Sequence, residues 1–485
     1  MGLLNVAIKG VVWSSLSTVV RSVVSLLQVS ILTRYLEKSD FGIVAIATLF
    51  IGFIQIFMDL GLSIGIIHKQ DITQKQYSSL FWFNVLSGLV LTIVLVALSP
   101  VVARLYDEPI LTHILALLSL NIFFSSLGNQ HRTVQQKNLR FKYISIIEIV
   151  TSLVTLALAV LLVRNGFGIY SLVYSTIFNI LFSNLLFLIL GLYADKNISF
   201  YFRLKEIRPF MKIGAFSVGA QVLDYFSREI DIILISATLG KDTLGLYSLC
   251  KKLVISIYSA INPILLKVLA PLLAMLQNDI NHLRKIYYDI IETISIVNFP
   301  IYFLIAIFSY GIIKFLYGET YVEGASVLSL LAIYYGYLSP VSSVGSLQTA
   351  LGRTDTGFYW TIFRTILSVV VIYIGSKWGL FGIVTSLLAM SFLSSPILWL
   401  ITIRPLIYGD FMSYFMKSFK SLVYTCILSL PFYMICRYFS SLSLILFMCV
   451  LFVICYIIPL FVFFRDTYAV RLSCKYISFL RKNEV

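Results

Sequence analysis

The chain has 485 residues, of which 59% are hydrophobic and only 12% are charged, and its mean hydropathy is +0.94. Soluble domains carry about 25% charged residues, so this composition excludes a soluble globular protein and predicts an integral membrane protein. The formal net charge is +15, and the distribution of the basic residues decides whether it reflects topology or an acidic partner.

Long apolar segments follow one another along the chain. About 20 apolar residues cross the hydrocarbon core as a helix, and about fourteen segments reach that length. Because the runs are unbroken and do not alternate with polar residues, they predict an all-α polytopic membrane protein and not a β-barrel. The predicted spans are residues 11–33, 41–64, 80–103, 110–130, 143–163, 168–193, 212–238, 244–268, 288–315, 324–350, 357–376, 380–403, 419–438 and 443–464.

Basic residues gather in every second loop. If the N-terminus is inside, most of the 37 Lys and Arg residues fall in cytoplasmic segments, as expected for short loops. The positive balance therefore indicates topology, and nucleic acid is not an expected partner. The first apolar run has no small-residue cleavage site, so we expect it to remain as an anchor, with both termini in the cytoplasm.

Motifs of enzymes and metal sites are missing from the sequence. The six cysteines form no CxxC pair, and the four histidines (His68, His113, His131 and His282) are scattered without HExxH spacing. No phosphate-binding GxxxxGK[ST] loop and no GxSxG elbow occur. We therefore expect no enzyme activity, no metal site and no organic cofactor.

Three short segments recur in order at a nearly constant offset. An even number of spans separates the copies, which predicts two like-oriented lobes of six helices each, related by a pseudo-two-fold axis along the membrane normal. The pairs are LEKSDFGIV (36–44) with LGKDTLGLY (239–247), LYDE (105–108) with LYGE (316–319), and GFGI (166–169) with LFGI (380–383).

The repeat predicts the domain organisation. Residues 1–195 form the N-terminal lobe and residues 212–403 the C-terminal lobe, joined by a cytoplasmic linker with an interfacial helix at 196–211. Residues 404–465 add helices 13 and 14, and residues 466–485 form a basic cytoplasmic tail.

Polar side chains follow one face of span 1 at helical spacing. Their counterparts on span 7 are also polar, and span 2 pairs with span 8 in the same way. We expect these four spans to line a central, water-accessible cavity. The candidate residues are Ser14, Thr18, Arg21, Ser25 and Gln28 on span 1, Asp224, Arg228 and Asp231 on span 7, Gln55 and Asp59 on span 2, and Tyr258 and Asn262 on span 8.

Several of these candidates are charged. A charge within the membrane costs at least about 2.5 kcal/mol and usually faces protein or water. Arg21 and Arg364 have no acid three or four residues away, so each requires a ligand, water or an acid on another helix. Arg228 has Asp224 one turn away, so a local ion pair between the two is the alternative to a ligand-binding role for Arg228. Of Lys251 and its neighbour Lys252, we expect one to face the cavity and the other to extend its ammonium to the surface.

The acids Asp59 and Asp224 open a second possibility. A carboxylate in a transport cavity can take up a proton or a sodium ion and so couple transport to a gradient. Asp224 also occupies the position equivalent to Arg21, and we expect the two to pair while no substrate is bound.

Four segments resemble the polysaccharide exporters of the multidrug/oligosaccharidyl-lipid/polysaccharide (MOP) flippase superfamily, above all the translocases of the colanic-acid and teichuronic-acid type. The resemblance is dense over residues 1–195 and thinner to about residue 400. The segments are ILTRYLEKSDFGIVAIATLF (31–50), DLGLSIGIIHKQDITQKQYSSLFWFN (59–84), QQKNLRFKYISIIEI (135–149) and NGFGIYSLV (165–173).

The resemblance implies a flippase of the bacterial cytoplasmic membrane. Such a protein moves an undecaprenyl-pyrophosphate-linked oligosaccharide from the inner to the outer leaflet by alternating access through a cationic cavity, and polysaccharide polymerase and assembly proteins are candidate partners. The resemblance implies that Arg21, with Arg228 or Lys251, holds the pyrophosphate or an acidic sugar. It also suggests that Gln28, Gln55, Tyr258 and Asn262 hydrogen-bond sugar hydroxyls.

Two other functions are open to a chain of this kind. A proton- or sodium-coupled exporter of small cationic compounds would need acids without partners in its cavity, whereas the deep charges without a local partner here are basic. A membrane glycosyltransferase or polymerase would need a large external loop, and the external loops are short.

Overall fold

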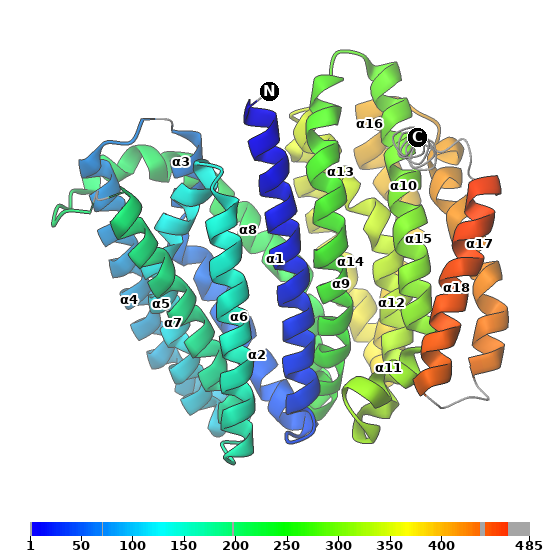
Figure 1. Ribbon diagram of the computed structural model, residues 1–485, viewed down its shortest axis with the longest axis horizontal. Coiled ribbons are helices and arrows are strands. Elements are labelled where there is room, and N and C mark those ends of the chain that lie inside the picture. Colours follow the sequence, from blue (N-terminus) through cyan, green and yellow to red (C-terminus); the bar gives the residue numbers. More distant parts are fainter. Residues whose placement is uncertain (1, 70, 196–197, 437–441, 464–485) are drawn as a thin grey trace, which may run out of the picture. The chain divides into compact units, whose positions relative to one another are not determined.

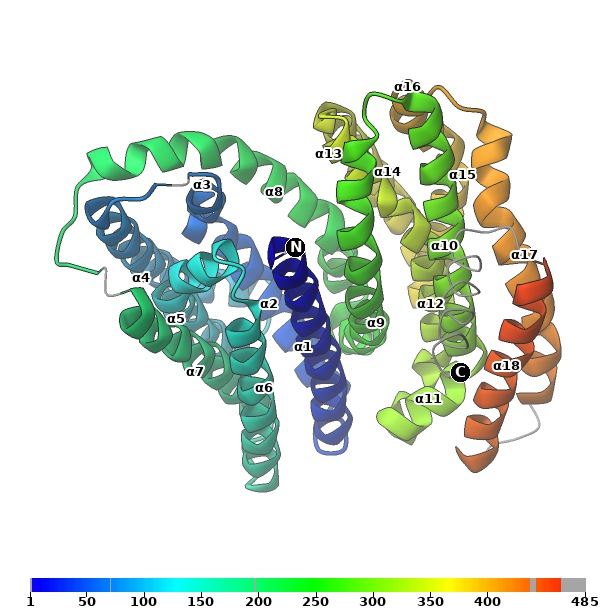
Figure 2. The same ribbon diagram turned by 45° about the horizontal axis from the view of Figure 1, so that its top comes forward.

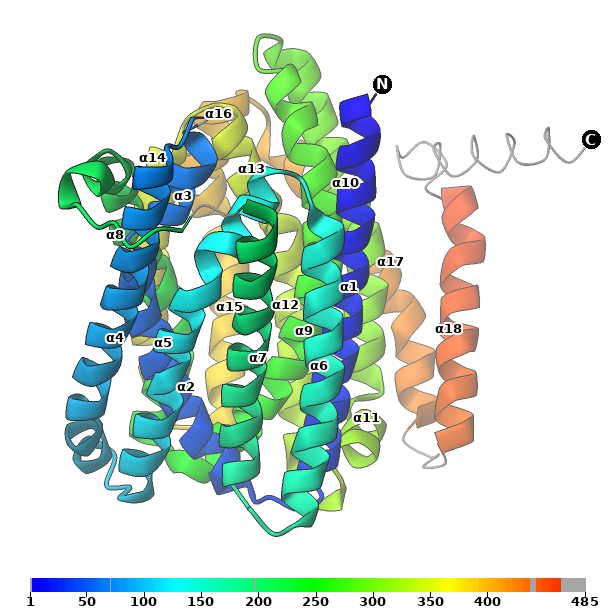
Figure 3. The same cartoon turned by 60° about the vertical axis from the view of Figure 1, so that its left-hand side comes forward.

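The computed structural model describes residues 2–69, 71–195, 198–436 and 442–463. Within these residues the chain forms helices and no strand (Figures 1 and 3). Twelve of the helical segments are long and apolar enough to cross a membrane. The predicted class of an all-α, multi-pass membrane protein is thereby confirmed. The basic tail predicted at 466–485 lies outside the described residues.

Each predicted span coincides with a helix or with a pair of consecutive helices. The first eight helices are α1 Gly2–Leu32, α2 Lys38–Asp59, α3 Leu62–His68, α4 Gln74–Leu105, α5 Ile110–Lys137, α6 Phe141–Arg164, α7 Tyr170–Asp195 and α8 Leu204–Thr238. The remainder are α9 Gly240–Met275, α10 Ile280–Ile307, α11 Ser309–Leu316, α12 Ala325–Val341, α13 Ser343–Ala350, α14 Thr354–Ser376, α15 Gly379–Leu398, α16 Arg404–Ile407, α17 Phe411–Cys436 and α18 Leu442–Phe463.

The predicted number of fourteen spans is not confirmed. The predicted span at 212–238 falls on α8, which is absent from the twelve because charged residues are spread along it, among them Lys205, Asp224 and Arg228. The span at 443–464 falls on α18, of which Phe447–Ile458 forms a shorter apolar helix in the described part.

The contacts between residues divide the chain into two compact units, Met1–Leu249 and Cys250–Val485. In this division α8 belongs to the first unit, where it packs against α2, α3 and α4. Figure 2 shows α8 curving over the end of the first unit that carries α3. The predicted lobe boundaries and the two-fold relation between the lobes stay predictions.

Helix α5 forms the centre of the first unit and packs on α4, α7 and α2, while α6 packs along α1. Its apolar face, which includes Leu111, Leu115 and Ile122, is fully buried. Small residues allow close approach on its other contacts: a Cβ on Gly128 would meet the backbone of Asn184 in α7. This packing places the polar faces of five helices around a common space.

The chain breaks between α2 and α3 at two left-handed residues, Leu60 (φ 44°) and Gly61 (φ 74°). The Asp59 carboxylate spans the break, accepting hydrogen bonds from the Ser63 backbone N–H (3.2 Å) and from Ser63 Oγ (2.6 Å). It satisfies donors at the start of α3 that have no partner inside the helix. The predicted span at 41–64 is therefore one long helix followed by a short one.

In the second unit, α10 packs between α12 and α17. Lys417 of α17 forms an ion pair with Glu292 of α10 (2.6 Å), whose side chain is almost fully buried. Tyr456 of α18 donates a hydrogen bond to the Ile296 carbonyl oxygen (2.9 Å). These two contacts fasten the last two helices, which lie outside the sequence repeat, to the second unit.

Two of the repeated segments contact each other inside the first unit. A Cβ on Gly42 of α2 would collide with the backbone of Lys241, and a Cβ on Gly245 of α9 would collide with the backbone of Lys38. The offset of the LEKSDFGIV repeat, 203 residues, relates Gly42 to Gly245 and Lys38 to Lys241. Backbone-to-backbone packing of α2 on α9 therefore requires glycine at both positions.

We predict that Gly42→Ala destabilises the protein by about 1–3 kcal/mol, because the added methyl group must push the α9 backbone away. Thermal unfolding of the purified protein in detergent measures the effect. Gly219→Ala is the matched control: Gly219 is also helical, but nothing lies within 4 Å of its Cβ position. Equal unfolding temperatures for the two variants would contradict the close packing.

Candidate anion-binding site

A polar cavity of about 250 Å³ lies within the first unit. Five helices line it, and most of the side chains that reach it carry a hydrogen-bonding group. They are Arg21 from α1; Gln55 and Met58 from α2; Ser125, Asn129 and Arg132 from α5; Glu148 and Thr151 from α6; and Asn179, Ile180, Ser183, Asn184 and Phe187 from α7.

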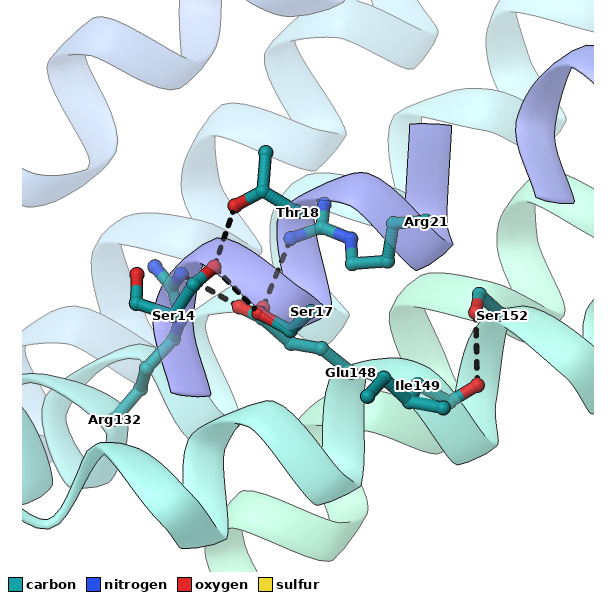
Figure 4. A network of polar contacts seen from close by, with 8 residues as sticks. All are labelled: Ser14, Ser17, Thr18, Arg21, Arg132, Glu148, Ile149 and Ser152. Carbon is teal, nitrogen blue, oxygen red and sulfur yellow. Dashed lines mark hydrogen bonds and ion pairs between the residues drawn. The ribbon is translucent and has the colours of Figure 1, made fainter. Parts of the chain in front are cut away.

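Two arginines in this cavity share one carboxylate. Arg21 Nη1 lies 3.0 Å from Glu148 Oε2, and Arg132 Nη2 lies 2.8 Å from Glu148 Oε1. Ser17, one turn before Arg21, donates a hydrogen bond to Glu148 Oε2 (3.3 Å). Figure 4 shows the carboxylate between the two guanidinium groups, which approach it from α1 and α5.

The three charged side chains differ in exposure, and the difference fixes what a ligand meets. The Glu148 side chain is 12% exposed, whereas those of Arg21 and Arg132 are 49% and 39% exposed. Two cations and one anion leave a net charge of +1. The cavity therefore presents two partly open guanidinium groups to an incoming ligand, and the one carboxylate among its lining residues lies deeper in the protein.

Polar side chains surround these charges. Asn179 donates to Thr155 Oγ1 (3.0 Å), and Asn129 donates to Asp59 Oδ1 (3.3 Å). Gln55 is exposed. The Thr151 hydroxyl is buried and has no hydrogen-bond partner among the described residues. The cavity thus offers donors and acceptors suited to a hydrated, oxygen-rich ligand.

Of the residues predicted from the sequence, Arg21 and Gln55 lie in this cavity, and Asp59 borders it through Asn129. Gln28 is about two turns further along α1 than Arg21, where it donates to Ser175 Oγ of α7 (3.2 Å). The expected pairing of Arg21 with Asp224 does not occur in this structure. Asp224 instead pairs with Arg228 on the next turn of α8 (2.6 Å), as the local alternative predicted.

A second cavity, of about 220 Å³, lies within the second unit. Arg364 of α14 and Tyr258 of α9 line it together with Trp360 and Gln348. Arg364 Nη2 donates to the Tyr334 hydroxyl (3.1 Å), and no carboxylate in the described part of the chain pairs with it. Arg364 and Tyr258, both predicted from the sequence, therefore share one space.

The last two predicted residues lie in packed surroundings. Lys251 is 5% exposed, whereas its neighbour Lys252 is exposed. Asn262 is buried and donates to Ser339 Oγ of α12 (3.2 Å). The lining of a central cavity by spans 1, 2, 7 and 8 stays a prediction.

Sequence reasoning missed several residues of the first cavity, chiefly Arg132 and Glu148. The span predicted to end at residue 130 leaves Arg132 in a loop, but α5 continues to Lys137. The sequence shows Glu148 as one of the acids that could take up a proton or a sodium ion, but its position near the cytoplasmic end of its span favours a solvated residue. A signal was present: polar residues recur at helical spacing on three more spans, as they do on span 1. They are Ser125, Asn129 and Arg132; Glu148, Thr151 and Thr155; and Asn179 and Ser183.

The family model described as "Polysaccharide biosynthesis protein" matches residues 31–326, more than half of the chain. The chain belongs to this family. The chain is similar to the lipopolysaccharide biosynthesis protein WzxC of Escherichia coli K12, which is 26% identical over 90% of this chain and 86% of WzxC. It is also similar to the teichuronic acid biosynthesis protein TuaB of Bacillus subtilis 168, which is 27% identical over 72% of each chain. The resemblance to polysaccharide exporters is confirmed.

Two solved structures share the fold of this polysaccharide biosynthesis family member. The lipid II flippase MurJ in an inward closed conformation aligns with a TM-score of 0.75 at 16% identity, over 94% of this chain and 99% of MurJ. An inward-facing multidrug resistance transporter of the MATE family, a member of the MOP superfamily, aligns with a TM-score of 0.60 at 13% identity, over 85% of this chain and 95% of that chain. The protein therefore has the fold that these two transporters share.

We predict that Asp59 can lose its charge without loss of the fold. In Asp59→Asn the amide oxygen still accepts from Ser63, and a flipped Asn129 side chain accepts from the new amide, so the unfolding temperature should stay near that of the wild type. Asp59→Leu, which offers no acceptor, should cost about 1–3 kcal/mol. Thermal unfolding of both variants checks this.

The same pair of variants tests Asp59 as a coupling residue. If it binds the coupling ion, Asp59→Asn remains folded but exports substrate independently of the proton or sodium gradient. Export that responds to the gradient as in the wild type removes Asp59 from the coupling residues.

Proposed function

We propose that the protein is a flippase for a lipid-linked anionic oligosaccharide, a repeat unit of a surface polysaccharide. The observation that carries the proposal is the half-exposed Arg21 guanidinium in a polar cavity with a net charge of +1. Membership in the polysaccharide biosynthesis family supports the saccharide part of the proposal.

Charge favours an anion as the group that enters the cavity. A unit charge at 4 Å is worth about 4 kcal/mol at an effective dielectric constant of about 20, and guanidinium groups match phosphate oxygens in bidentate geometry. A cationic drug would be repelled by the same net charge. The charge of the cavity therefore favours an anionic substrate over the cationic compounds of the alternative function.

The size of the cavity limits what it holds. Ligand pockets for drug-sized molecules usually enclose about 300–1,000 Å³, and this cavity encloses about 250 Å³. A phosphate-bearing headgroup or one acidic sugar fits such a volume. The rest of the oligosaccharide and the polyprenyl chain lie outside it, the latter in the bilayer.

The direction of transport in this proposal is the one that the resemblance to polysaccharide exporters implies. With both termini in the cytoplasm of a bacterium, the lipid-linked unit is made at the inner leaflet of the cytoplasmic membrane and delivered to the outer leaflet by alternating access. Polymerase and assembly proteins would then receive it. Coupling to a proton or sodium gradient, with Asp59 or Asp224 as the carboxylate, is part of this proposal.

We predict that Arg21→Ala lowers surface polysaccharide at least about tenfold in a strain that depends on this protein, since a hydrogen bond to a charged group contributes about 1.5–3 kcal/mol. Arg21→Lys should retain part of the activity, because it keeps the charge and loses the bidentate geometry. Immunoblotting or carbohydrate analysis of the cell surface measures both.

Arg104→Ala is the matched control, since it removes an exposed arginine at the end of α4 outside the cavity. It should leave polysaccharide at the wild-type level. Normal export by Arg21→Ala, at equal protein abundance, would overturn the proposed anion site.

A further inference from the structure

Glu148 holds a position that a ligand would be expected to hold. Its two oxygens each contact a different arginine, Arg21 at 3.0 Å and Arg132 at 2.8 Å. A phosphate group presents oxygens to paired guanidinium groups in the same way. The Glu148 carboxylate, which belongs to the protein itself, thus occupies the space between the two guanidinium groups that face the cavity.

We propose that Glu148 is an internal counter-anion that is displaced by the substrate. In the empty protein it neutralises one of the two arginines. When an anionic headgroup enters, its phosphate oxygens take over the contacts with Arg21 and Arg132, and the Glu148 carboxylate moves away. This inference rests on the proposed flippase function. It assigns to Glu148 the role of determining how much negative charge the substrate must carry.

Electrostatics favours a site in which Glu148 is exchanged for the substrate over a site in which the two arginines have no anionic partner before the substrate binds. The guanidinium groups of Arg21 and Arg132 carry like charges and repel each other, and that repulsion costs free energy when no anion lies between them. Glu148 removes that cost before the substrate arrives. Exchange of one anion for another keeps the arginines partnered throughout.

The local surroundings give the displaced carboxylate further partners. Ser17 Oγ already donates to Glu148 Oε2 (3.3 Å). The Thr151 hydroxyl lies one turn after Glu148 on α6 and has no hydrogen-bond partner among the described residues. This hydroxyl is buried and is therefore a partner for the Glu148 carboxylate and not for the ligand.

The exchange selects for the charge of the ligand. A group with one negative charge, such as the carboxylate of an acidic sugar, only replaces the charge that Glu148 supplies and gains nothing from the second arginine. A pyrophosphate carries at least two negative charges and gains from both. The site is therefore specific for the pyrophosphate headgroup and not for a single acidic sugar.

The test uses the purified full-length protein in lipid nanodiscs with farnesyl pyrophosphate as the probe and farnesol as its neutral counterpart. Glu148→Gln keeps the shape of the side chain and removes its charge. We expect this variant to bind farnesyl pyrophosphate about tenfold more tightly than the wild type, by calorimetry, and to bind farnesol unchanged. Export in cells should fall, because the headgroup is released more slowly.

Glu108→Gln is the matched control. Glu108 also pairs with a cation, Lys241 (2.5 Å), but lies outside the cavity. This variant should bind farnesyl pyrophosphate with wild-type affinity. If Glu148→Gln cannot be purified, Glu148→Asp decides the question: its shorter carboxylate cannot contact both arginines as Glu148 does, so it should also bind the probe more tightly than the wild type.

The outcomes separate this inference from the proposed function. Equal or weaker binding of farnesyl pyrophosphate by Glu148→Gln, or by Glu148→Asp, overturns the exchange while leaving a wild-type anion site in place. No difference between farnesyl pyrophosphate and farnesol in the wild type, together with normal export by Arg21→Ala, overturns the anion site and the exchange with it.

Discussion

A guanidinium group in the middle of a membrane-spanning helix must be balanced by another group. In this protein Arg21 of α1 is balanced by Glu148 of α6, and the same carboxylate balances Arg132 of α5. Three helices are thereby tied together around a polar space, and one positive charge is left over. This arrangement depends on the packing of α6 along α1 and on the extension of α5 to Lys137, which bring the three charged residues together. The polar faces of α2 and α7 complete the cavity around them.

The helical spans could be predicted from the sequence because the requirement for apolar length is local. Within the described residues every predicted span coincides with a helix or with consecutive helices, and the errors lie where a turn or a run of charges interrupts the apolar pattern. The left-handed residues Leu60 and Gly61 end α2 inside a predicted span. Charged residues interrupt the apolar pattern along α8, where Asp224 and Arg228 are exposed and pair with each other.

The candidate site could be predicted only in part. Arg21 and Gln55 are recognisable because their helices carry polar residues along one face. Arg364 is recognisable as a charge deep in a span without a nearby acid, and Tyr258 as the repeat counterpart of Gln55. The pairing of Glu148 with the two arginines could not be predicted, because it depends on which helices are neighbours. A single sequence does not contain that information. The partner of Arg21 is 127 positions away in the chain, whereas the repeat places it at Asp224.

The internal repeat has a physical counterpart at one place in the described structure. Gly42 and Gly245, equivalent in the LEKSDFGIV repeat, each lie against the backbone of the other segment, and Lys241 is further held by Glu108 (2.5 Å). Backbones in such close contact leave no room for an added side-chain atom, so small changes in the distance between them are poorly tolerated. The two copies of the segment therefore meet through the same surface.

The central claim is that Arg21 and Arg132 bind the anionic headgroup of a lipid-linked saccharide. A cryo-electron microscopy structure of the protein in nanodiscs, determined with a polyprenyl-pyrophosphate-linked sugar, tests it most directly. We predict phosphate density within hydrogen-bonding distance of both guanidinium groups, with the Glu148 carboxylate withdrawn from between them. A bound headgroup elsewhere, with the Arg21–Glu148–Arg132 contacts unchanged, would contradict the claim.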